Sequence, residues 1–168
     1  MKDDWKKSPL FKKAQDIYKL VTHLVQVVEN TDIKFENDIE SELLQHNLDY
    51  LRKNAMIIPA KITRATNKDT PYDLKMESAT LIRKAAKELI TDVRGLEMYG
   101  YKDEEYLNLL RQDVEAFRIL FAEWVNTFDP WNYTIDRWGL FNPPGVNYDD
   151  HDPDDDIPFN PDDFFDGN

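Results

Sequence analysis

The sequence predicts an all-α protein, an up-down-up-down bundle of four helices followed by an irregular C-terminal extension. Apolar residues recur at steps of three and four in four stretches, which is helical spacing. Cap signals and short polar connections separate these stretches, as in bundles of antiparallel neighbours. After Phe128 the pattern stops, and the remainder holds six of the nine prolines. We therefore expect a bundle at residues 1–128, an aromatic segment packed on it at 129–147, and an acidic mobile tail at 148–168.

The first predicted helix opens at Ser8-Pro9, where a hydroxyl N-cap precedes a proline at the first helical position. It ends near Asn30. Its apolar stripe consists of Leu10, Ala14, Ile17, Val21, Leu24, Val25 and Val28. A polar connection follows from Thr31 to Asp38, in which two apolar residues are expected to contact the bundle.

The second predicted helix follows an acidic stretch, Glu36 to Glu42, which suits the positive end of a helix dipole. Its stripe consists of Leu44, Leu48, Leu51, Ala55, Ile58, Ile62 and Ala65. Pro59 lies inside that stripe and costs about 3 kcal/mol unless packing compensates. We predict that the helix continues through Pro59 with a bend, to about Thr66.

The third predicted helix runs from Tyr72 to about Tyr99, after a turn at residues 67–69. Thr70-Pro71 repeats the cap-plus-proline signal, and Asp73 is placed to answer it. Its predicted buried residues are Leu74, Ala79, Ile82, Ala86, Leu89, Val93 and Leu96. Gly100 is expected to end this helix in a positive-φ conformation.

The fourth predicted helix is capped by Asp103. Its stripe is a heptad pattern made of Leu107, Leu110, Val114, Phe117, Phe121, Trp124 and Phe128. Leu109, Ala116 and Leu120 lie beside that stripe and widen the apolar face. This strip favours a homo-oligomer with these residues at the interface, and the alternative is a wide core edge within one bundle.

Charge divides the chain. The formal net charge is −12, but from Asp129 onward there are eleven acids and one base, a net of −10, which leaves −2 for the rest. The extension is therefore the acidic part and a candidate interaction segment. With no cysteine and no apolar run near the ~18 residues of a membrane span, we expect a soluble, cytoplasmic protein without contact to a membrane.

Motifs for chemistry are missing. Two-metal helical bundles use Glu-x-x-His, but Leu20 and Leu43 stand three residues before His23 and His46, and we expect no buried carboxylate in the stripes. No glycine-rich phosphate loop occurs. The alternating aspartates after residue 149 lack the glycine and glutamate of a calcium loop. The sequence therefore predicts no enzymatic activity, no cofactor and no metal site.

The extension has two predicted parts. Trp131, Trp138, Leu140 and Phe141 are expected to pack on the bundle, because burial of large aromatic side chains is favourable. After Asn147 the acids alternate with proline and phenylalanine, with too little apolar area to offset ordering entropy. We expect this second part to stay mobile until it binds a protein partner.

The tail contains two acidic-aromatic peptides. The segment Asp154-Asp155-Asp156-Ile157-Pro158-Phe159 resembles the acidic tip of bacterial single-stranded DNA-binding proteins, which docks into basic-rimmed apolar pockets of partner proteins. In that family the phenylalanine is terminal, whereas nine residues follow here. Phe164 and Phe165 form the second peptide. The alternative interpretation is a solvating tail.

A basic surface near the Pro59 kink is the alternative functional candidate. It comprises Lys61, Arg64, Lys68, Arg83, Lys84 and Lys87. Such residues could contact phosphates of a nucleic acid with salt-dependent affinity, or form an ordinary solvated helix face. In a further interpretation the acidic tail mimics nucleic acid and covers this surface.

The segment from Leu43 to Thr66 and the later Gly100-Tyr101-Lys102-Asp103-Glu104-Glu105 carry a family resemblance. They resemble the four-helix bundle proteins encoded in intervening sequences of bacterial 23S rRNA genes, with Ile58, Pro59, Ala60 and Ile62 in the family's positions. Lys61, Arg64 and Ala65 depart from its Asn, Glu and Gly. The family is related to the accessory protein of diversity-generating retroelements, a cyclic pentamer that binds a reverse transcriptase and nucleic acid. The resemblance implies a homopentameric scaffold.

Overall fold

The computed structural model describes residues 4–156, and the regular elements in this part of the chain are all helices, without strands, which confirms the predicted four-helix bundle. The elements are η1 (Asp4–Lys7), α1 (Pro9–Glu29), α2 (Asp38–Ala65), α3 (Tyr72–Met98), α4 (Glu104–Val125) and η2 (Pro153–Asp156). Short connections link antiparallel neighbours, as the sequence predicts.

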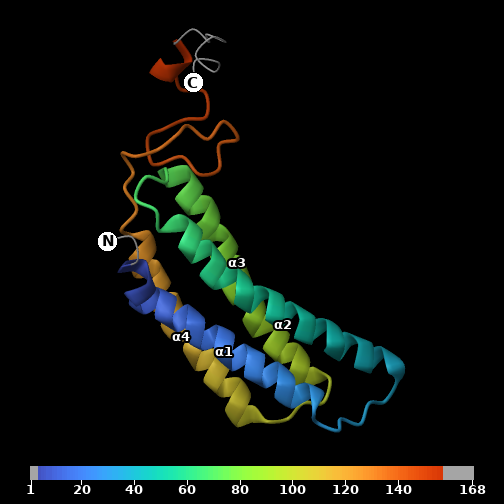
Figure 1. Cartoon of the computed structure of the whole chain (residues 1–168). Helices are drawn as coiled ribbons and strands as arrows, with labels where there is room; N and C mark the ends of the chain where they lie inside the picture. The colour runs from blue at the N-terminus through green and yellow to red at the C-terminus, as the bar shows by residue number, and fades with distance from the viewer. Residues whose placement is uncertain (1–3, 157–168) are drawn as a thin grey trace, which may run out of the picture.

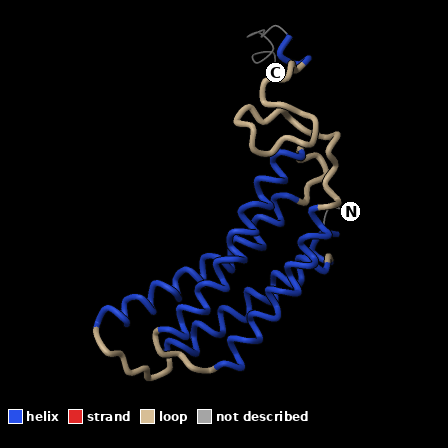
Figure 2. The backbone as a smooth tube through the Cα atoms, turned by 180° about the vertical axis from the view of Figure 1, so that it is seen from behind, coloured by secondary structure: helices blue, strands red, loops and turns tan. Residues whose placement is uncertain are grey.

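The four helices do not pack equally. Helix α2 lies along α3 over much of its length, α1 contacts both α2 and α4, and α3 and α4 have the smallest contact among the neighbouring helix pairs. Figure 1 shows the pairing of α2 with α3 and of α1 with α4. The extension lies at the end of the bundle where α2 turns into α3, as both views show (Figures 1 and 2).

The predicted caps of α1 and α4 are confirmed. The Ser8 hydroxyl accepts a hydrogen bond from the Phe11 amide at 3.2 Å, and an Asp103 carboxylate oxygen accepts one from the Tyr106 amide at 3.3 Å. Each cap satisfies one of the amides that a helix start leaves without an intrahelical partner. Gly100 has a φ of 102°, which permits the predicted stop after α3.

Helix α2 continues through Pro59, as predicted. The helix tolerates the hydrogen bond that Pro59 cannot donate because the apolar residues on either side of it are buried in the core. Ala55 is 1% exposed, and Ile58 and Ile62 are 0% exposed. The Thr63 hydroxyl also donates to the Pro59 carbonyl at 3.0 Å. Packing of the apolar stripe therefore maintains the helix across the proline.

The start of α3 corrects the sequence prediction. Pro71, not Thr70, is the N-cap residue, and no side chain caps the helix. Asp73 instead accepts hydrogen bonds from the C-terminal extension, and Leu74 is exposed rather than buried. The first turn of α3 therefore contacts the extension through Asp73 and does not bury Leu74 in the core.

The far end of α4 also differs from the prediction. The helix ends at Val125, and Phe121 and Trp124 are half-buried while Phe128 beyond the helix is buried. These aromatic rings form a chain, with Trp124 edge-on to Phe128 at 4.7 Å between centroids. Phe121 lines a groove between α3 and α4, whereas the earlier stripe residues Leu107, Leu110, Val114 and Phe117 are buried in the core as predicted.

The expectation of no buried carboxylate in the stripes is wrong. Asp73 and Asp92 of α3 are 8% and 7% exposed, and Asn54 of α2 is 3% exposed. The Asn54 amide donates to Asp92 at 3.3 Å between α2 and α3. Desolvation by burial raises the pKa of Asp92 to about 6, against the Asn54 hydrogen bond that lowers it. The α2–α3 interface thus holds an ionisable group at its centre.

Candidate protein-interaction site

The extension is attached to the start of α3 by three hydrogen bonds. The Tyr72 amide donates to the Asn132 carbonyl at 2.6 Å. The amide and hydroxyl of Thr134 donate to the two oxygens of the Asp73 carboxylate at 3.0 and 2.8 Å. Bonds to an ionised carboxylate are stronger than neutral ones. The chain after α4 therefore crosses to α3 and is fixed there.

Beyond Thr134 the chain folds into a closed loop around one carboxylate. The oxygens of Asp136 accept the amides of Trp138, Leu140 and Phe141 at 2.8 to 3.0 Å. These bonds lower the pKa of Asp136. The side chain of Asn142 closes the loop by bonding both the amide and the carbonyl of Asp136. We call residues 136–142 the display loop.

The side chain of Arg137 connects the display loop to the acidic residues that follow it in the sequence. One nitrogen of the Arg137 guanidinium donates to the carbonyls of Tyr148 and Asp150 at 3.0 and 2.7 Å. Another donates to a carboxylate oxygen of Asp155 at 2.9 Å. The contacts of Arg137, together with those of Asp136, hold the display loop and the following residues in place. This segment is exposed and has no apolar core of its own.

The large side chains of the extension are exposed, which contradicts their expected packing on the bundle. Trp131 is 88% exposed, Trp138 is 92% exposed and Leu140 is 75% exposed. Phe141 is half-buried, and Phe128 and Pro143 are the buried apolar residues of this region. The prediction was based on the aromatic content of the extension, whereas hydrogen bonds to Asp136 and Asp73 hold its backbone in place.

Ordered exposure of this kind suits protein recognition. Tryptophan is among the residues that dominate binding energy at interfaces, and several large apolar side chains exposed on one short segment are typical of an interaction site. Because the backbone is already fixed by hydrogen bonds, little loop entropy is lost when a partner covers it. The display loop with Trp131 is therefore the principal candidate site.

A groove between α3 and α4 is the second candidate site. It has a cavity volume of about 560 Å³. We call it the α3–α4 groove; its apolar lining consists of Ala86, Ile90, Val114, Phe117, Phe121, Ala122 and Val125. Its charged lining is four basic residues and one acidic residue, Arg83, Lys87, Arg111, Arg118 and Glu115. Sequence periodicity placed Phe121 in the core and so missed the groove.

The predicted basic surface is divided by the structure. Arg83 and Lys87 line the α3–α4 groove and have no ion-pair partner among the described residues. Lys84 lies 3.9 Å from the Glu88 carboxylate. The other three members, Lys61, Arg64 and Lys68, do not line this groove. Two of the six predicted residues thus share a surface that could bind a ligand.

The predicted oligomer strip lies on the opposite side of α4 from the groove. Asp113, next to this strip on the helix, faces α1 through a 3.3 Å ion pair with Lys13. Leu109 is 47% exposed, Ala116 is half-buried, and Leu120 is half-buried against the core. The homo-oligomer through this strip stays a prediction.

The predicted tail peptides are only partly within the described residues. Asp154, Asp155 and Asp156 lie in η2, and Asp155 contacts Arg137. Ile157, Pro158, Phe159, Phe164 and Phe165 lie outside the described residues. The expectation of a mobile tail over residues 148–168 lies outside the described residues from 157 on, whereas Tyr148, Asp150 and Asp155 are described and bond to Arg137.

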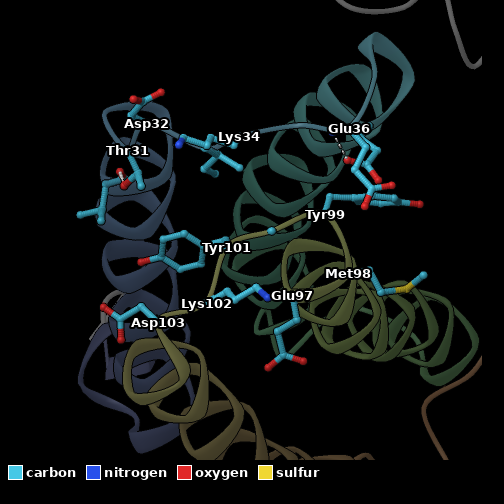
Figure 3. A pocket seen from close by; sticks show the side chains of 14 residues that line it. Thr31, Asp32, Lys34, Glu36, Glu97, Met98, Tyr99, Tyr101, Lys102 and Asp103 are labelled. Atoms are coloured by element: carbon cyan, nitrogen blue, oxygen red, sulfur yellow. Dashed lines mark hydrogen bonds between the residues drawn. The ribbon is translucent and has the colours of Figure 1, made fainter.

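A hollow at the opposite end of the bundle is less specific. It has a cavity volume of about 780 Å³ between the α1–α2 and α3–α4 connections (Figure 3). Charges of both signs line it, including Lys34, Lys102 and Glu97, so it favours no single ligand. The Tyr101 hydroxyl is buried there without a hydrogen-bond partner in the described part of the chain, and desolvation raises its pKa.

Residues 4–156 contain neither a candidate metal cluster nor a candidate membrane span. No cluster of three or more His, Cys, Asp or Glu side chains in this range could hold a metal ion. No helix in this range is both long and apolar enough to cross a membrane. Comparisons with protein-family models, with curated proteins and with solved structures found no match to this chain. The resemblance to the 23S intervening-sequence proteins therefore stays a prediction.

Proposed function

We propose that the protein is a non-enzymatic, homo-oligomeric helical scaffold that recruits a protein partner through its C-terminal extension. The observation that supports this proposal most is the display loop, in which Trp138 is 92% exposed while its backbone is held by Asp136. A pentamer, as the family resemblance implies, is the assembly we propose. Nucleic-acid binding by Arg83 and Lys87 is the alternative.

Charge supports the same role for the extension. From Asp129 to Asp156 it holds eight acidic residues and one basic residue. Acidic groups around apolar anchors steer approach toward a basic surface and give an on-rate that falls with salt. The partner that fits this surface is therefore a protein with an apolar pocket and a basic rim.

Affinity capture with point variants tests the proposal. The bait is the full chain, compared with Trp131→Ala/Trp138→Ala/Leu140→Ala. Tyr50→Ala is the matched control, because Tyr50 is an exposed aromatic of α2, 52% exposed and remote in sequence from the extension. We expect the triple variant to lose proteins that both the intact chain and the control capture, since removal of anchor side chains typically costs more than about 2 kcal/mol each.

The opposite result has a plain meaning. If the triple variant captures the same proteins in the same amounts as the Tyr50→Ala control, the extension does not recruit a partner. Capture that disappears on nuclease treatment and in the Arg83→Ala/Lys87→Ala variant would favour the nucleic-acid alternative.

A further inference from the structure

The α3–α4 groove and the display loop are complementary in polarity. The groove has an apolar floor that includes Ile90 and Phe121, and its volume of about 560 Å³ lies within the range of ligand pockets, roughly 300–1,000 Å³. The display loop presents Trp138 and Leu140 on either side of Gly139, whose φ of 74° turns the chain there. An apolar tip on one part of the molecule thus matches an apolar recess on another.

Their charges are complementary too. Arg83 and Lys87 at the groove have no ion-pair partner in the described range. Asp149 and Asp150 lie beside the display loop. The Arg137 guanidinium donates a hydrogen bond to the Asp150 carbonyl, and the side chain of Tyr148 lies next to Gly139. When Trp138 enters a groove, these aspartates come close to its basic rim.

The loop does not occupy the groove of its own chain. It is attached at the first turn of α3 through Asp73 and Thr134, and Trp138 is 92% exposed. The groove begins further along α3, at Arg83. One chain therefore presents both halves of a contact at separate places, which is the requirement for a heterologous, head-to-tail interface.

We infer that the α3–α4 groove binds the display loop of a second copy of this chain. The inference rests on the proposed function and names the first partner of the extension. Trp138 fills the groove, Leu140 packs beside it, and the neighbouring aspartates meet Arg83 and Lys87. Such a contact buries about 150–250 Å² for the tryptophan, well below the ~800 Å² per partner of standard interfaces. The exposed side chains of Trp131 and Tyr148 are available to add to this area, and we expect association at micromolar concentration.

Mixing two defective variants tests this directly. The loop variant is Trp138→Ala/Leu140→Ala. The groove variant is Ala86→Glu/Ala122→Glu, which places carboxylates in the lining at a half-buried and an exposed alanine. The control is Thr91→Glu, an exposed α3 position that does not line the groove. Circular dichroism and thermal unfolding verify that each variant folds, and sedimentation velocity gives the mass.

We expect the intact chain and Thr91→Glu to assemble, and each double variant alone to sediment as a single chain of 19.9 kDa. An equimolar mixture should form a heterodimer of twice that mass, because one intact loop meets one intact groove. A mixture that stays monomeric, a groove variant that assembles like the intact chain, or an intact chain that never assembles would overturn the inference.

The outcomes for the two proposals are separable. If the groove variant assembles normally while the loop variant loses its captured protein, the loop binds another partner and the proposed function stands without this inference. If a single-stranded oligonucleotide binds the monomer and dissociates the assembly, the groove is a nucleic-acid-binding site and the inference is wrong. Loss of neither capture nor assembly in the loop variant would contradict both.

Discussion

Replacement of Asp92 by asparagine should stabilise the protein at neutral pH. Asp92 is 7% exposed between α2 and α3, and the amide of Asn54 donates to it at 3.3 Å. Burial is the largest influence on its pKa, and the nearby Glu88 carboxylate acts in the same direction, so the pKa rises from 3.8 to about 6. Asparagine keeps the shape and a hydrogen bond to Asn54 but carries no charge.

The sign and size of the effect follow from linkage. The folded state holds the Asp92 proton more tightly than the unfolded chain, so its contribution to stability is complete below pH 3.8 and lost as the pH rises through about 6. At about 1.4 kcal/mol per pKa unit, the loss is at most about 3 kcal/mol, and access of water reduces it to about 1–3 kcal/mol. Asparagine does not titrate and avoids this loss.

Urea unfolding at several pH values measures it. The gain of Asp92→Asn over the intact chain should be near zero at about pH 4 and reach about 1–3 kcal/mol at about pH 8. Asp69→Asn, in the exposed α2–α3 turn, is the matched control. A gain that does not grow with pH, or a less stable variant at high pH, would show that Asp92 is not a buried carboxylate of raised pKa.

Three other perturbations follow from single contacts. Tyr101→Phe should leave stability unchanged or raise it by about 1 kcal/mol in urea unfolding, since its buried hydroxyl has no partner in the described part; a loss would reveal an unseen partner. Asp136→Ala should speed proteolysis within residues 136–142 without changing bundle unfolding, because its carboxylate holds three loop amides; unchanged cleavage would refute this. Ending the chain at Phe128 should lower the free energy of unfolding by about 1–3 kcal/mol by leaving Asp73 unpaired, whereas ending it at Asn147 removes exposed contacts only and should have little effect; equal losses would contradict this.

Periodicity predicted the helices because an apolar stripe and a cap are local properties. Ser8 and Asp103 cap as expected, and α2 runs through Pro59 because its flanking residues are fully buried. These features depend on residues within a few turns of one another. The fold class was therefore predictable from the sequence.

The extension was predicted less well because its order is polar. Aromatic content suggested burial of Trp131 and Trp138, but Asp136 and Asn142 organise the loop by hydrogen bonds and leave both indoles in solvent. The sequence does contain a turn signal here, because Asp136 precedes Trp138 by two residues and Gly139 follows it. Side-chain burial, in contrast, depends on which surface lies opposite.

The α3–α4 groove and the pairing of Asn54 with Asp92 could be found only from the three-dimensional structure. Phe121 fits the heptad pattern of α4, and nothing local indicates that it lines a groove between α3 and α4. Asn54 and Asp92 each follow a stripe residue by three positions, so their burial was readable from spacing, but their pairing across α2 and α3 was not. Contacts between helices are set by the whole core.

The molar mass of the intact protein in solution tests the central claim most directly, because a scaffold built from exposed anchors and a matching groove must self-associate. Light scattering at micromolar concentration should return a multiple of the 19.9 kDa chain, with five copies as the proposed assembly, and the mass should fall as salt rises. A constant 19.9 kDa at every concentration and salt would contradict the account.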